Sequence, residues 1–194
     1  ELIKELKLDL KVSVVLGDDL MTEKSKFSEL NTKEMYSNED FPAEDKIASI
    51  NAYLGAFPIA EALKSGADIV ITGRSVDSAV TLGACIYTFG WNEKEYDKLA
   101  AGSLAGHIIE CGTQSTGGNF TDWELVSKDL HQIGYPIVEV SEDGSFDCTK
   151  SKNSTGMVSF GTVAEQMLYE IGDPQAYILP CLLYTSPSPR DDQT

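Results

Sequence analysis

The sequence is short of basic residues, and this shortage excludes two classes of partner. Fifteen Lys and Arg side chains stand against 31 Asp and Glu among 194 residues, which leaves a formal net charge of -16. A surface of that sign repels phosphate backbones and anionic lipids. We therefore expect neither a nucleic acid nor a membrane surface as a partner. The remaining composition, 42% hydrophobic and 24% charged, is typical of a globular chain with a packed core.

Long apolar runs and disulfide patterns are also missing. No stretch approaches the roughly 20 apolar residues that a transmembrane helix needs. Residues 1–6 (ELIKEL) lack the basic start and cleavage site of a signal peptide. The four cysteines include no C-x-x-C pair, so reduced thiols are expected. We predict a cytoplasmic protein, with an organelle matrix as the alternative.

The two ends of the chain differ from the rest of the sequence. Glu1 is not an initiator Met, and the stretch from Cys181 resembles an in-frame translation of a sequencing-library adapter. We expect residues 1–180 to be a fragment of a single α/β domain. We expect residues 181–194 to be an artefactual tail that packs against nothing. A natural Pro/Ser tail is the alternative interpretation.

The first half of the chain alternates strand and helix patterns. Short β-branched apolar runs at 11–16 and 67–73 predict strands that are covered on both faces of a sheet. Apolar residues at helical spacing predict helices over 56–66 and 75–90, the second capped by Ser75. This order predicts an α/β fold with a mostly parallel sheet flanked by helices.

The second half is expected to add helices and a hairpin. Helical patterns are present at 103–110 and 162–171. Residues 135–147 alternate around Asp143-Gly144, a turn sequence that favours an antiparallel hairpin in the C-terminal third.

Polar residues follow the two predicted strands at the point where each strand ends. Asp18 and Asp19 follow the first strand, and Arg74 and Asp77 follow the second. Because the carboxyl ends of parallel strands meet at one sheet edge, we expect these residues and Asn51 to surround one substrate cleft. The alternatives are that the aspartates cap a helix and that Arg74 forms a salt bridge with Asp77. The predicted substrate is a small anionic molecule bound by Arg74.

A second set of candidates shares one face of the predicted helix 103–110. His107, Glu110 and Cys111 have the i, i+3, i+4 spacing that brings side chains together, and we assign His107 and Glu110 to proton transfer. Cys111 is a candidate nucleophile, although a helix C-terminus raises a thiol pKa and a lone Cys is commonly a small buried hydrophobe. Zinc sites need more ligands than these, so no metal is predicted.

The glycine-rich loop after this helix is the third candidate. The loop from Gly112 to Asn119, which contains Thr116, Gly117 and Gly118, could wrap an anionic group with backbone N–H donors, and a flexible turn is the alternative. We expect this loop to close over the same cleft. The chain has neither G-x-x-x-x-G-K-[ST] nor G-x-G-x-x-G, so no nucleotide cofactor is indicated and the cofactor stays undefined.

These segments together resemble the acyclic terpene utilisation A-like proteins over about residues 11–180. The resemblance is carried by GDD at 17–19, NAYLGA at 51–56, ADIVITGR at 67–74, LAAG at 99–102, AGH at 105–107, ECG at 110–112, TGG at 116–118, GYPI at 134–137 and DPQAY at 173–177.

The resemblance implies a soluble protein for the catabolism of acyclic terpenes such as citronellol and geraniol. In that context the substrate would be a branched acyl acid or its coenzyme A thioester, and the chain would be an enzyme or enzyme subunit. The alternative is a non-catalytic binding or assembly subunit of a complex in the same pathway. A homo-oligomer is left open.

Overall fold

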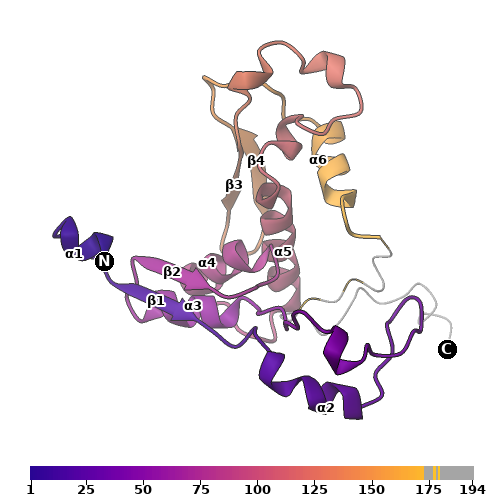
Figure 1. Ribbon diagram of the computed structural model, residues 1–194. Helices are drawn as coiled ribbons and strands as arrows, with labels where there is room; N and C mark the ends of the chain where they lie inside the picture. The colour runs from indigo at the N-terminus through magenta and orange to yellow at the C-terminus, as the bar shows by residue number, and fades with distance from the viewer. Residues whose placement is uncertain (173–176, 178, 180–194) are drawn as a thin grey trace.

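The computed structural model describes residues 1–172, 177 and 179, and the long helix α5 (Tyr96–Glu110) lies at its centre. Figure 1 shows α5 joining two halves of the molecule. The N-terminal half contains α1 (Leu2–Glu5), β1 (Val12–Val15), α2 (Lys24–Glu29), α3 (Phe57–Lys64), β2 (Ile69–Thr72) and α4 (Ala79–Phe89). The C-terminal half contains β3 (Pro136–Val140), β4 (Phe146–Lys150) and α6 (Phe160–Leu168).

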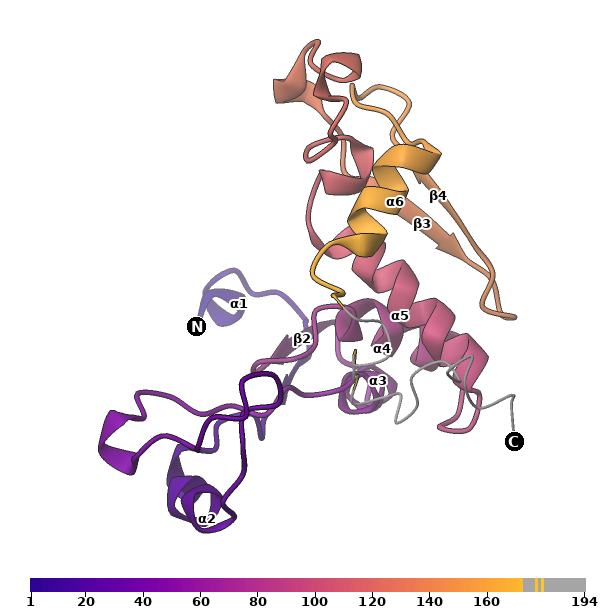
Figure 2. The same cartoon turned by 90° about the vertical axis from the view of Figure 1, so that its right-hand side faces the viewer.

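Short 3-10 turns lie in the connections between these elements. They are η1 (Met21–Glu23), η2 (Glu44–Lys46), η3 (Gln114–Thr116), η4 (Trp123–Leu125) and η5 (Leu130–Gln132). Helix α2 and its flanking turns extend away from the rest of the N-terminal half in both views (Figures 1 and 2). No helix in the described part of the chain is long and apolar enough to cross a membrane.

The predicted parallel pairing and the predicted hairpin are both confirmed. Strands β1 and β2 are parallel, with Val12 opposite Ile69 and Val15 opposite Thr72. Strands β3 and β4 are antiparallel, with Pro136 opposite Lys150. The β-branched runs and the Asp-Gly turn therefore indicate strands correctly, because both signals are local to the chain.

The expectation that helices cover both faces of the β1–β2 pair is wrong for the residues that the structure describes. Helix α3 packs against one face, where Val15 is buried and Val70 contacts the core. The opposite face exposes Val14 at 57% and Ile71 at 55% of their surface. A continuous apolar run predicts a strand but does not say what covers each of its faces.

Helix α4 begins later than predicted. Its N-cap is Ser78, which makes no side-chain capping bond, and the expected cap at Ser75 is wrong. The physical reason is that residues 74–76 pair with Leu54: the Leu54 N–H donates to the Arg74 carbonyl at 3.0 Å, and the Val76 N–H donates to the Leu54 carbonyl at 3.0 Å. This pairing commits residues 74–76 to a bridge with Leu54, and residues 77–78 form the turn from which the helix then starts.

Helices α4 and α5 pack closely because α5 carries glycines at the contact. A Cβ on Gly102 would lie 2.7 Å from Leu82 Cδ1, and a Cβ on Gly106 would lie 2.7 Å from the Ser78 carbonyl oxygen. A larger side chain would push the helices apart. The approach sets Ser78 beside the C-terminal turns of α5, and the buried residues around it form the core with Ile59, Ile86 and Leu99.

Two polar contacts attach the C-terminal half. Gln166 Nε2 of α6 donates to the His107 carbonyl at 2.8 Å, and Trp91 Nε1 donates to the Glu142 carbonyl in the hairpin turn at 2.9 Å. Helix α6 starts with a capping box formed by Ser159 and Thr162. Helix α5 is longer than the predicted segment 103–110, and α6 starts at Phe160 and ends at Leu168, before the predicted end at residue 171. The predicted tail, 181–194, lies outside the described residues.

Replacing Gly106 by Ala tests the helix contact. We expect Gly106→Ala to lower the free energy of unfolding by about 1–3 kcal/mol, because the added methyl group meets the Ser78 backbone and not a flexible side chain. Denaturant-induced unfolding measures this change. Val80→Ala, on the exposed face of α4, is the control and should change the unfolding free energy by less than about 0.5 kcal/mol. Equal stability of Gly106→Ala and Val80→Ala would contradict the account.

Candidate functional site

A polar cavity of about 390 Å³ lies where four segments of the chain meet. Its walls come from Tyr53, the segment before α4, the last turns of α5 and the residues that follow α6. The lining includes Arg74, Asp77, His107, Glu110 and Glu170. The cavity adjoins an open groove of about 710 Å³, which also contains Arg74, Asp77 and Glu110. Several of the predicted site residues therefore share one hollow.

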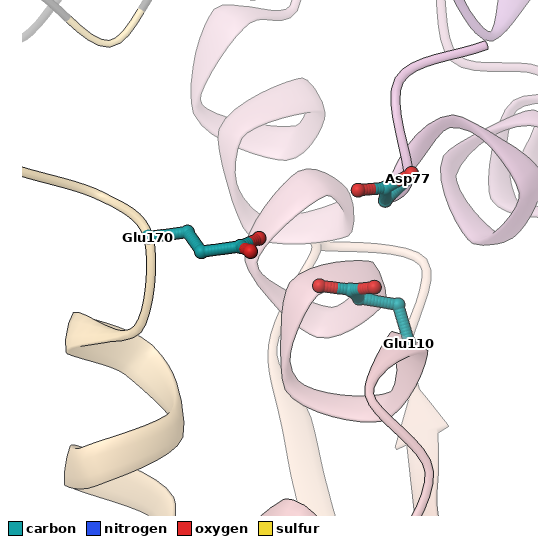
Figure 3. A group of neighbouring side chains, drawn as sticks. All are labelled: Asp77, Glu110 and Glu170. Carbon is teal, nitrogen blue, oxygen red and sulfur yellow. The ribbon is translucent and has the colours of Figure 1, made fainter. Parts of the chain in front are cut away.

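Three carboxylates converge in this cavity. One oxygen each of Asp77, Glu110 and Glu170 lies within 4.8 Å of the other two. Figure 3 shows the three side chains turned toward one another from the loop before α4, the end of α5 and the loop after α6. Carboxylate oxygens are the ligands that Mg²⁺ and Ca²⁺ prefer, so these are the described residues that could hold a divalent cation. Glu170 belongs to no recognisable motif and was not predicted from the sequence.

Arg74 supplies positive charge at the edge of the carboxylate group. Its Nη2 lies 3.3 Å from Asp77 Oδ1, and its guanidinium carbon lies 4.3 Å from the centre of the Tyr53 ring. The salt bridge between Arg74 and Asp77, which was the alternative to substrate binding by Arg74, is therefore present. The pair is about half exposed, so its contribution to stability is small, and the guanidinium still lines the cavity.

Buried His107 and partly buried Glu110 form a pair in the wall of the cavity. His107 is 6% exposed, and its Nδ1 lies 3.7 Å from Glu110 Oε1. The other ring nitrogen, Nε2, is buried without a hydrogen-bond partner among the described residues. A carboxylate beside Nδ1 favours the tautomer that carries its proton there. Nε2 is then left with a free lone pair that can accept a proton.

Cys111 lies next to this pair but has the electrostatics of an unreactive thiol. Its Sγ donates to Glu110 Oε1 at 3.0 Å. Burial, together with the neighbouring Glu110 carboxylate, raises the pKa of Cys111 to about 11. The thiol is therefore protonated at neutral pH. Because the thiolate is the nucleophilic form of cysteine, Cys111 is poorly suited to act as a nucleophile. Cys111 is not among the described residues that line the polar cavity.

Hydrogen bonds of Asp18, Asp19 and Asn51 hold the loops near the ends of β1 and β2 in place. The Asp18 carboxylate accepts from the Arg74 N–H at 2.8 Å and from Asn51 Nδ2 at 3.1 Å. The Arg74 hydrogen bond is the main reason that the pKa of Asp18 is lowered. Asp19 accepts from the Met21 N–H at 3.0 Å, which forms an Asx turn and not a helix cap. These three side chains are not among the described residues that line the polar cavity.

The glycine-rich loop uses its hydrogen-bonding groups internally. Thr116 is fully buried, and its hydroxyl donates to the Gly134 carbonyl at 2.6 Å. The N–H groups of Gly117 and Gly118 donate to the carbonyls of Gln114 and Thr113. The structure does not bring this loop into the polar cavity, whose described lining includes no residue of 112–119. Amides that are already paired cannot cradle an anion.

A second cavity, smaller and apolar, meets the polar one at His107. Its volume is about 180 Å³, and its walls include Ala100, Leu104 and Ile171 as well as Ser103 and His107. His107, Tyr177 and Leu179 line both cavities. Ser103 was not predicted from the sequence, although its i, i+4 spacing from His107 is a signal that could identify it.

A larger cavity lies elsewhere in the described chain. Its volume is about 730 Å³, and it is lined by residues of α3, the end of α4 and the segment 90–94. Its titratable lining consists of surface Glu and Lys side chains and one Tyr. We place the candidate site at His107, because buried acid–base groups there adjoin both a polar and an apolar cavity.

The chain matches a known protein family over nearly all of its length. The model of the acyclic terpene utilisation family protein AtuA matches residues 1–184. The chain belongs to the AtuA family. The resemblance found in the sequence is thereby confirmed, and membership indicates a role in acyclic terpene utilisation. No curated protein and no solved structure matches the chain.

Alkylation of this AtuA-family chain tests the state of Cys111. Raising a thiol pKa from 9.0 to about 11 leaves about 100-fold less thiolate at pH 8. We expect iodoacetamide to modify Cys111 about that much more slowly in the folded chain than in the urea-unfolded chain, with the rate rising until the pH passes 11. Mass spectrometry with Cys111→Ser as the control assigns the product. Rapid modification of folded Cys111 at pH 8 would contradict the buried-thiol account.

Proposed function

We propose that this AtuA-family chain is an enzyme or enzyme subunit of acyclic terpene utilisation that transfers a proton on a branched acyl acid or its coenzyme A thioester. The observation that carries the proposal is the place of His107. Its imidazole is buried between a polar and an apolar cavity, with a carboxylate on one side and a free nitrogen on the other. General bases have this arrangement.

The two cavities suit the two parts of such a substrate. The side chains of Ala100, Leu104 and Ile171 form apolar walls that favour a branched hydrocarbon chain. The polar cavity on the other side of His107 offers charged groups to a carboxyl or thioester head. A substrate that spans both would place its reacting carbons next to the imidazole.

Arg74 supports an anionic head group. Among the described residues that line the polar cavity, Arg74 is the one Lys or Arg. A carboxylate or phosphate can compete with Asp77 for the guanidinium, because their pair is exposed to water and weakly held. Arg74 would then offset the repulsion that three carboxylates and the net charge of -16 exert on an anion.

Proton transfer would use the His107–Glu110 pair as a unit. His107 Nε2 would accept a proton from the substrate, and the Glu110 carboxylate would stabilise the positive charge that forms on the ring. Glu110 would thus act through His107 by holding its tautomer. Such a base contributes a rate factor of about 10²–10⁴.

A non-catalytic assembly role is the second candidate, and one observation favours it. The face of the β1–β2 pair that points away from α3 exposes Val12, Val14, Ile69 and Ile71. Exposed aliphatic side chains that lie together favour protein contact. This role would not need His107.

Growth on an acyclic terpene separates the two functions. We expect the wild-type gene to restore growth on citronellol to a bacterium whose own AtuA-family gene is deleted, and His107→Gln to fail to restore it, because Gln cannot take up a proton. His131→Gln is the matched control, since His131 is the other histidine and lies exposed. Normal growth with folded His107→Gln protein would refute the catalytic function and leave the assembly role.

A further inference from the structure

The apolar cavity beside His107 contains two buried polar atoms that have no partner. Ser103 is 5% exposed and His107 6% exposed, and both line this cavity. Neither Ser103 Oγ nor His107 Nε2 has a hydrogen-bond partner among the described residues. A buried group left unpaired costs about 1–3 kcal/mol, so a native structure that keeps two at one place calls for an explanation.

The two groups belong to one face of one helix. Ser103 and His107 are four residues apart in α5, so they are neighbours on its surface. The surrounding side chains of Ala100, Leu104 and Ile171 are apolar and cannot satisfy them. Ser78 and Tyr177 also line the cavity, but neither is a hydrogen-bond partner of Ser103 Oγ or His107 Nε2. The cavity is therefore a mostly apolar hollow whose α5 wall carries two unpaired polar groups.

The chemistry of the two groups specifies what could satisfy both. Glu110 beside Nδ1 leaves His107 Nε2 as an acceptor, whereas the Ser103 hydroxyl can donate. A ligand hydroxyl would donate its hydrogen to His107 Nε2 and accept from Ser103 Oγ. A ketone or ether oxygen could pair with Ser103 alone, and a hydrocarbon with neither.

We propose that this cavity binds an aliphatic chain that carries a hydroxyl group, with the hydroxyl held between Ser103 Oγ and His107 Nε2. The inference deepens the proposed function by naming a hydroxylated substrate class and by adding Ser103 as the residue that selects it. Sites that hydrogen-bond a substrate hydroxyl discriminate strongly against analogues that lack it, because their polar groups are then left unpaired.

Two ligands of the same shape test the proposal. 3-Methyl-1-butanol carries the hydroxyl, and 2-methylpentane has a methyl group in its place. Binding of each to the chain is measured by ligand-observed NMR titration. We expect Ser103→Ala to weaken binding of the alcohol by about 3- to 10-fold, the loss of one hydrogen bond, and to leave binding of the hydrocarbon unchanged.

Three results would overturn the proposal. The first is that the alcohol does not bind the wild-type chain, as expected for a cavity that holds only water. The second is that the alcohol binds Ser103→Ala and the wild-type chain equally well. The third is that Ser103→Ala weakens binding of both ligands equally, as expected if Ser103 has a merely structural role. Ser127→Ala, at an exposed serine, is the control and should change neither affinity. Binding needs no turnover, so failure here leaves the His107 growth test intact, and failure of that test leaves this binding site intact.

Discussion

The contact between Gly106 and Ser78 is the constraint on which the site depends. The backbone of α5 reaches the segment before α4 at this point because position 106 has no side chain. Asp77 precedes Ser78, while His107 and Glu110 follow Gly106 within about one helical turn. One close approach between two helices thus brings together acidic and imidazole groups that lie about 30 residues apart in the sequence.

The electrostatics of the site follow from that approach. Three carboxylates meet in this cavity, with the Arg74 guanidinium beside Asp77 and the His107 ring beside Glu110. Such a concentration of like charge favours a cation or a hydrogen-bond donor in the cavity. His107 lies between this charged region and the apolar walls of the smaller cavity. Its two ring nitrogens therefore meet different surroundings, which is the requirement for directed proton transfer.

Local signals in the sequence predicted which segments form helices and strands. Contacts between distant segments determine where α4 starts and which faces of the strands are covered, and the sequence did not predict these. The parallel pair, the hairpin and the helix at residues 57–64 follow from apolar spacing and turn residues. The start of α4 depends on pairing with Leu54, and the bare face of β1–β2 depends on what packs there. Neither property is encoded in a short window of sequence.

The residues of the candidate site could likewise be predicted only in part. Arg74, Asp77, His107 and Glu110 were identified from their types and spacing and line one cavity. Glu170 and Ser103 were missed, because a single acid or hydroxyl gains its meaning from neighbours that only the fold supplies. The glycine-rich loop was expected in the cleft because the same composition suits an anion cradle and a tight internal turn.

The protonation of the His107 ring tests the central claim most directly. Nitrogen-15 NMR of the folded chain at neutral pH distinguishes the two neutral tautomers, with His107→Gln used to assign the signals. Our account predicts a protonated Nδ1 beside Glu110 and an unprotonated Nε2 facing the cavity. A proton on Nε2 with a bare Nδ1 would contradict it, because the nitrogen available to the substrate would then have no lone pair to accept a proton.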